Sequence, residues 1–272
     1  MDLGRLSGQS AQPGLSVRTL SNQEIELPSY EEQKKVVSIL SVLDDKILVN
    51  NQINKNLEQQ ARALFHQWIA STSSTIYRLS DIADINPETY SPKDNWRFVN
   101  YLDTSSIIAG TITGVQYILP SKEKLPSRAR RILRKNDIVF STVRPNQLHY
   151  GIISNPKPNM LGSTGFAVIR SKYTVIPNEL IYLALTEEFF VEQMQHLAEQ
   201  SVSTFPSIRP ADLDACVLPE PKVKDDNFMM TIKTIFNTIA TNDEESHRLA
   251  ALRNTLLPRL ISGELDISGI EI

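Results

Sequence analysis

The sequence of 272 residues predicts an α+β protein, with one mixed domain between two long helices that pack antiparallel. Three observations predict it. Apolar residues recur at alternating steps of four and three in one segment near each end, which is the seam of a coiled coil. The two segments are copies of one element, and Leu27-Pro28 before the first recurs as Leu218-Pro219 before the second. Between them, β-branched and aromatic runs alternate with turn residues, as in short strands.

The first long helix is expected over residues 31–69. Glu31 and Glu32 place negative charge in its first turn, where the helix dipole favours acids. Small hydroxyl residues from Ser71 to Thr75 end it. The residues expected to pair along its seam are Leu40, Leu43, Ile47, Asn50, Leu57, Leu64 and Trp68.

The second long helix is expected from about Asp225 to Ile261. Pro258 should bend or end it in the last turn, and Gly263 is suited to cap its C-terminus. The residues expected to pair along its seam are Ile232, Ile235, Ile239, Asn242, Leu249 and Leu256.

Both seams become polar at the same place, at Asn50 and Asn54 in the first and at Asn242 and Ser246 in the second. If the helices pack antiparallel, these polar centres meet, and a buried Asn layer then fixes the register of the pair. Alternatively, the midpoints are merely exposed. The recurrence at equivalent positions in both copies favours the matched pairing.

The region from about 72 to 217 has the pattern of a separate mixed domain. One helix is expected after Pro177, with apolar residues on one face. These are Leu180, Leu183, Phe190, Met194 and Leu197. The expected strands are 97–102, 111–118, 137–143, 151–154 and 166–170.

Composition excludes several classes of protein. The chain is 41% hydrophobic with a net charge of −3, and its longest apolar run of six residues is far below the roughly 20 of a transmembrane helix. The first 25 residues lack the apolar run of a secretory signal. The single cysteine, Cys216, fits a reducing compartment, so a cytoplasmic protein is expected. Four scattered histidines are poor material for a metal site, and no metal is expected.

Charge is most uneven over residues 121–150, which hold eight basic and two acidic residues. The basic residues are Lys122, Lys124, Arg128, Arg130, Arg131, Arg134, Lys135 and Arg144. Such a local excess is typical of a surface that binds a polyanion, and arginine suits phosphates and guanine edges. A solvated loop is an equally good explanation of the pattern by itself.

Further polar side chains could contact nucleic acid. Asn146 and Gln147 follow an expected strand, and amides of this kind bond adenine edges. Thr164 lies in a small polar loop, as do Ser203 and Thr204. All of these loops could also be ordinary turns.

No catalytic constellation stands out in the sequence. Glu32-Gln33-Lys34 and Asp44-Asp45-Lys46 match half of a nuclease motif, but both lie inside the expected long helix. Glycine-rich phosphate loops are absent from the sequence. Cys216 has no base beside it in the chain and is expected to be a packed residue. A stand-alone nuclease or methyltransferase is therefore disfavoured.

Several motifs resemble those of the type I restriction–modification specificity (S) subunits. Segments of the first helix resemble the central conserved region of this family, namely 27–35, 43–47, 50–58 and 63–65. The run Leu256-Leu257-Pro258-Arg259-Leu260-Ile261-Ser262-Gly263-Glu264-Leu265 resembles its terminal signature. Segments 137–145, 165–170 and 205–208 resemble recurrent parts of its target recognition domains.

The resemblance implies a DNA-recognition subunit without an active site of its own. A full S subunit is similar to two tandem units, each a target recognition domain followed by a conserved long helix. The paired helices hold the domains apart, and each domain reads one half of a split site in double-stranded DNA. The partners are methyltransferase subunits, which methylate adenine N6 with S-adenosylmethionine, and restriction subunits, which use ATP and Mg²⁺. The chain itself is expected to bind no cofactor.

By the same resemblance, this chain holds one complete recognition domain. The expected parts are a remnant of a missing first domain (1–26), a spacer helix (27–70), the recognition domain (71–219), a second spacer helix (220–263) and a tail (264–272). Since one domain reads half a site, two copies are expected to associate and recognise a symmetric, interrupted sequence. The alternative is a coiled-coil interaction module whose middle domain binds a protein.

Overall fold

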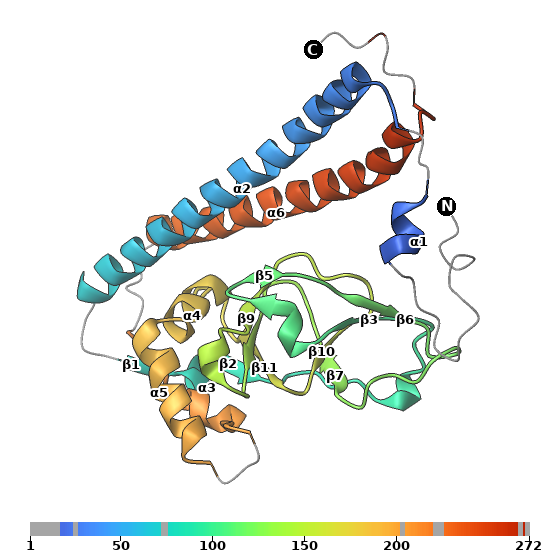
Figure 1. The fold of residues 1–272 in the computed structure, drawn as a ribbon. Coiled ribbons are helices and arrows are strands. Elements are labelled where there is room, and N and C mark those ends of the chain that lie inside the picture. Colours follow the sequence, from blue (N-terminus) through green and yellow to red (C-terminus); the bar gives the residue numbers. More distant parts are fainter. Residues whose placement is uncertain are drawn as a thin grey trace. The chain divides into compact units, whose positions relative to one another are not determined.

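A computed structural model describes residues 17–23, 27–71, 76–201, 205–219, 226–265 and 269 (Figure 1). The chain divides into two compact units. The first, the helical unit, comprises Met1–Val49 and Glu245–Ile272; the second, the domain unit, comprises Asn50–Glu244. Each of the two long helices contributes one part to each unit.

The first long helix, α2, spans Tyr30–Ser71, and a short helix, α1 (Val17–Ser21), precedes it. A reciprocal cap starts α2, because the Ser29 N–H donates to Glu32 Oε2 at 2.8 Å and the Glu32 N–H donates to Ser29 Oγ at 3.3 Å. The expected helix over 31–69 is confirmed, with two further residues at the C-terminal end and one at the start.

The second long helix, α6, spans Asp226–Ile261. Pro258 lies inside its last turn, and the helix ends three residues later. Gly263 has a φ of +71°, the left-handed conformation that glycine adopts at low cost, and its N–H points to the Leu260 carbonyl. The sequence expectation for this helix end is confirmed. No helix in the described part of the chain is long and apolar enough to cross a membrane.

In the helical unit, α2 and α6 run antiparallel. Val36 packs near Leu260, with Leu40 and Leu256 half-buried against them. Two ion pairs run between the helices, Asp44 with Arg253 and Lys46 with Glu245. Residues near the start of α2 therefore contact residues near the end of α6.

In the domain unit, the two polar centres meet. Asn242 Nδ2 donates to Asn54 Oδ1 at 2.8 Å, and Asn54 Nδ2 donates to Asp243 Oδ1 at 2.7 Å. Asn50 is almost fully buried and its Nδ2 lies 3.4 Å from the Asn242 carbonyl oxygen. The matched pairing predicted from the two seams is confirmed, and the alternative of exposed midpoints is wrong for Asn50.

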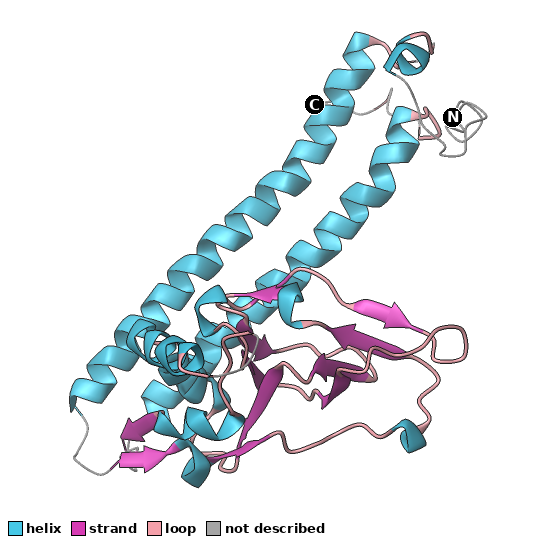
Figure 2. Ribbon diagram, turned by 60° about the horizontal axis from the view of Figure 1, so that its bottom comes forward, coloured by secondary structure: helices cyan, strands magenta, loops and turns pink. Residues whose placement is uncertain are grey.

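The rest of the domain unit consists of short strands joined by long loops (Figure 2). Two four-stranded sheets have the orders β6-β3-β10-β7 and β2-β11-β8-β9, and the consecutive strands β10 and β11 link them. Only β3 and β10 are parallel neighbours among the described pairs. The strands are β1 (Ile76–Arg78), β2 (Ala83–Ile85), β3 (Val99–Leu102), β4 (Ile107–Ile108), β5 (Thr111–Ile112), β6 (Gln116–Ile118), β7 (Ala129–Ile132), β8 (Asp137–Ser141), β9 (Tyr150–Ile153), β10 (Met160–Ser163), β11 (Phe166–Ser171) and β12 (Val217–Pro219).

Short helical segments fill several connections in this unit. They are α3 (Leu79–Ile82) and the 3₁₀ turns η2 (Pro92–Asp94), η3 (Thr104–Ser106), η4 (Pro145–Gln147) and η5 (Pro210–Ala215). Strand β1 pairs with β12, so the two ends of the domain meet in one small sheet.

The expected single helix after Pro177 is wrong: the segment forms two helices, α4 (Asn178–Leu185) and α5 (Glu188–Glu199). The break comes at Thr186, whose carbonyl oxygen accepts a hydrogen bond from Arg62 of α2 at 3.3 Å. Leu197, expected on the apolar face, is 39% exposed.

The main core lies between the sheet containing β8 and β11, the helices α4 and α5, and the parts of α2 and α6 that belong to the domain unit. Phe65 and Trp68 of α2 are buried in it, and Trp68 stacks on Phe228 of α6 at 5.3 Å between ring centroids. Tyr182 of α4 meets Phe236 of α6 edge to face. Burial of this large aromatic area stabilises the packing of α2, α4 and α6 in the domain unit.

Candidate nucleic-acid interface

Loops from several strands gather at one edge of the domain unit. Because β3 and β10 are parallel neighbours, the loops that follow Leu102 and Ser163 leave the sheet at the same end. The Thr142 N–H and hydroxyl both donate to the Gly165 carbonyl, at 2.8 and 3.0 Å, which brings the end of β8 to the same place. A Cβ at Gly165 would lie 2.8 Å from the Thr104 methyl carbon, so a larger residue would displace the Thr104 side chain. We call the set 103–106, 128, 142–149, 163–165 and 205–208 the loop cluster.

Basic and hydroxyl side chains meet at this edge. The Thr164 N–H donates to the Arg128 carbonyl at 2.8 Å, and both side chains are exposed. Arg144 is exposed as well, with its guanidinium 5.2 Å from the centroid of the Phe205 ring. Neither Arg128 nor Arg144 has an acidic partner among the described residues. Two unpaired cations therefore stand beside an exposed hydroxyl, an arrangement that suits a phosphate backbone.

Arg130 and Arg131 are neighbours on β7, so their side chains point to opposite faces of the sheet. Arg130 Nε donates to the Ser127 carbonyl at 3.3 Å. Arg131 Nε is buried without a hydrogen-bond partner in the described structure, and this burial lowers the pKa of Arg131. The two arginines cannot act on one surface in the same way.

Arg134 belongs to an ion network at the other end of β7. Its guanidinium donates to Glu88 at 2.7 Å, and Arg170 donates to Glu88 at 2.7 Å and to the fully buried Asp137 at 2.7 Å. Hydrogen bonds from Arg134 and then Arg170 lower the pKa of Glu88 to about 2. The charge of Arg134 is thus paired with Glu88 of the same domain.

The basic residues expected at 121–150 are consequently divided. Lys135 lies in the turn after β7, while Arg128 precedes this strand, and four residues of strand extend about 13 Å. Lys122 and Lys124 are exposed in the β6–β7 loop and form no ion pair with a described residue. The structure brings together Arg128, Arg144, Asn146, Gln147 and Thr164, whereas Ser203 and Thr204 lie outside the described residues.

An acidic group in the loop cluster has no signal in the sequence. Asp103 accepts hydrogen bonds from the Tyr101 hydroxyl at 2.9 Å and from Ser105 Oγ at 3.0 Å. Burial opposes ionisation of Asp103, but these hydrogen bonds outweigh it and lower the pKa of the carboxyl group. Burial also raises the pKa of Tyr101. The ionised Asp103 thereby orders the turn at the end of β3, and only the pairing of β3 with β10 reveals its position.

Comparisons with known proteins agree with the motifs of the first helix. The family model described as "Type I restriction modification DNA specificity domain" matches residues 2–59. The chain is 24% identical to the type I restriction enzyme MjaIX specificity subunit of Methanocaldococcus jannaschii, over 97% of this chain and 66% of that protein. It is 21% identical to the HindI specificity subunit of Haemophilus influenzae, over 93% of this chain and 71% of that protein.

The chain is therefore similar to type I specificity subunits over nearly its whole length. Solved structures show the same fold. The S subunit of a type I system from M. genitalium matches with a TM-score of 0.53 and 14% identity over 97% of this chain and 69% of that one. The HsdS subunit from Thermoanaerobacter tengcongensis matches with a TM-score of 0.50 and 23% identity over 67% of this chain and 46% of that one. The chain spans about two thirds of the length of the curated relatives that it matches.

The residues of the two helix seams contact one another within each unit. Trp68, Ile232 and Ile235 are buried in the main core, where Leu57, Leu64 and Ile239 are half-buried against them. Leu40 and Leu256 pack in the helical unit, and Leu43, Ile47 and Leu249 are half-buried. Asn50 and Asn242 form the polar layer.

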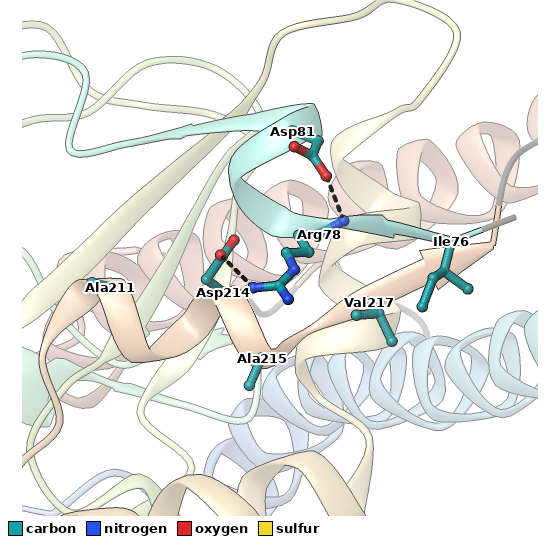
Figure 3. A pocket seen from close by; sticks show the side chains of 7 residues that line it. All are labelled: Ile76, Arg78, Asp81, Ala211, Asp214, Ala215 and Val217. Atoms are coloured by element: carbon teal, nitrogen blue, oxygen red, sulfur yellow. Dashed lines mark hydrogen bonds and ion pairs between the residues drawn. The ribbon is translucent and has the colours of Figure 1, made fainter.

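A pocket lies beside β1 and β12, where the domain closes (Figure 3). It is lined by Ile76, Arg78, Asp81, Ala211, Asp214, Ala215 and Val217. The Arg78 guanidinium lies 3.8 Å from the Asp214 carboxylate, and the Asp81 carboxylate accepts a hydrogen bond from the backbone N–H of Arg78. Within the described ranges, no group of three or more His, Cys, Asp and Glu side chains could hold a metal ion. Cys216 is buried nearby, and burial raises the pKa of its thiol to about 12.

Proposed function

We propose that this chain is the DNA-recognition subunit of a type I restriction–modification complex and binds half of a split double-stranded site through the loop cluster. The observation that carries the proposal is the exposed group of Arg128, Arg144 and Thr164 at one edge, beside the amides of Asn146 and Gln147. Cations and hydroxyls there would hold phosphates, and amides would contact base edges.

The catalytic chemistry would belong to partner subunits. Methyltransferase subunits would bind S-adenosylmethionine and methylate adenine N6, and restriction subunits would bind ATP and Mg²⁺. In this scheme the chain recognises the DNA site and catalyses no reaction. The complex acts on DNA in the cytoplasm. The helices α2 and α6 supply the spacer on which the subunits assemble.

We further propose that two copies associate. The chain would hold one complete recognition domain (71–219), and residues 11–28 align with 202–219, the closing segment of that domain, through Leu27-Pro28 and Leu218-Pro219. One domain reads one half-site, so a split site requires a second domain. Two copies related by a two-fold axis would then read the same half-site in opposite orientations.

Methylome mapping tests the recognition role. Cells that carry this chain with a type I methyltransferase subunit should show N6-methyladenine in one defined motif, and cells without this chain should not. Methylation that is absent or independent of this chain contradicts the proposal. Binding of a protein partner without any DNA preference would favour a coiled-coil interaction module instead.

A further inference from the structure

Strained backbone is concentrated where two loops of the domain unit meet, the β4–β5 turn and the segment around η4. Seven non-glycine residues in the described part of the chain have positive φ, and four of them are asparagines, which tolerate this region. The other three are Ala109, Arg144 and Leu148, with φ of +44°, +47° and +57°. These three are neighbours in space, since the Ala109 N–H donates to the Leu148 carbonyl at 2.7 Å. Strain of this kind persists only where the surroundings impose it, and it is enriched at functional sites.

Three separate elements hold the backbone of the segment Arg144–Leu148. The Arg144 N–H donates to the Pro206 carbonyl at 3.0 Å, and Gln195 of α5 accepts a hydrogen bond from the Asn146 N–H at 3.2 Å. Leu148 is fixed by the bond from Ala109 before β5. The 3₁₀ turn η4 is therefore a rigid tip, preorganised before any ligand binds.

The exposed side chains on this tip indicate that it binds a ligand. Asn146 and Gln147 are exposed, and their amide groups have no hydrogen-bond partner among the described residues. The stack of Arg144 on Phe205 holds a planar cation at the base of the tip. A rigid loop that displays two unpaired amides beside a cation has the donor and acceptor pattern needed for base edges.

We propose that Arg144–Leu148 is the base-reading loop of this chain, with the amides of Asn146 and Gln147 recognising adenine in the major groove. This inference rests on the proposed function in DNA recognition. An amide offers one acceptor and one donor, which match adenine N6 and N7 together. Arg128 and Thr164 hold the neighbouring phosphates and fix the register of the loop on the duplex.

The test is selection of bound sequences from a randomised duplex library by the purified full chain. Wild type should enrich one half-site. Gln147→Ala and Asn146→Ala should each lose base preference at one or two positions and keep it at the others. They should lower specific affinity by about 5- to 100-fold and leave the salt dependence of binding unchanged. Gln60→Ala on the exposed face of α2 is the matched control and should keep the full preference.

Two isosteric variants sharpen the result. Asn146→Asp and Gln147→Glu replace a donor by an acceptor, so the preferred base at the affected position should shift from adenine toward cytosine, whose N4 amino group is a donor. Loss of structure cannot produce a new preference. If wild type enriches a half-site and all four variants enrich the same one, the loop assignment is wrong. If wild type enriches no sequence, the proposed function itself fails.

Discussion

At the scale of single residues, the basic side chains fall into two groups. Arg128 and Arg144 have no acidic partner among the described residues, whereas Arg134 is paired with Glu88. Arg128 and Arg144 should act directly on DNA. Replacing both by Ala should weaken binding and lower the slope of log affinity against log salt by about 2, since each phosphate contact contributes roughly 0.9. Fluorescence anisotropy over a salt series measures this slope. Lys122→Ala with Lys135→Ala removes the same charge outside the loop cluster and should leave the slope nearly unchanged; equal effects of the two pairs would contradict the assignment.

The Glu88 network gives a second prediction at this scale. Since the folded pKa of Glu88 is about 2, its ion pairs stabilise the domain above pH 4.5, and this stability is lost as the pH falls toward 2. Glu88→Gln should cost about 1–2 kcal/mol at pH 7, a figure kept small because the Glu88 carboxyl group is partly exposed to solvent. Urea unfolding should show the difference from wild type narrowing between pH 5 and pH 3. Glu123→Gln, in an exposed loop, serves as the control, and a gap independent of pH would argue against the network.

At the scale of elements, the polar layer between α2 and α6 should lower the stability of the helix pair and fix its register. Asn54→Leu or Asn242→Leu alone leaves the other amide without its 2.8 Å hydrogen bond and should destabilise by about 1–2 kcal/mol. The double variant removes both amides and should recover most of that loss, with a coupling energy of about 0.5–3 kcal/mol. A double-mutant cycle from urea unfolding measures it. Strictly additive losses would mean that the two amides do not act as a pair.

The long helices could be predicted from sequence because their seams repeat over many turns, and the caps at Ser29 and Gly263 are local. The strands were harder. Residues 111–118 form β5 and β6 with a break between them, and the expected helix after Pro177 breaks where Arg62, far away in the sequence, captures the Thr186 carbonyl. Periodicity cannot report such a tertiary contact.

The candidate site shows the same limit at this scale. Composition located the basic segment, but only the sheet pairing shows that Arg128 lies beside Thr164. The ion pair between Arg134 and Glu88 joins residues 46 positions apart, so no local sequence pattern predicts it. The strained conformations of Arg144 and Leu148 likewise accompany hydrogen bonds to Pro206 and Ala109, which are distant in the sequence, and do not follow from residue type.

At the scale of the whole molecule, the number of recognition domains determines what the protein can read. Under the proposal above, each chain contributes one recognition domain, and a split site takes its second half from another chain. Two-fold pairing of identical chains makes both halves the same, and the motif then becomes an interrupted palindrome. Pairing with a different S subunit would give two unlike halves. We therefore expect light scattering to report a dimer at micromolar concentration and the methylated motif to be symmetric about its spacer. A strict monomer that still directs a symmetric motif would place the second copy inside the methyltransferase complex, and a monomer with an asymmetric motif would contradict self-association.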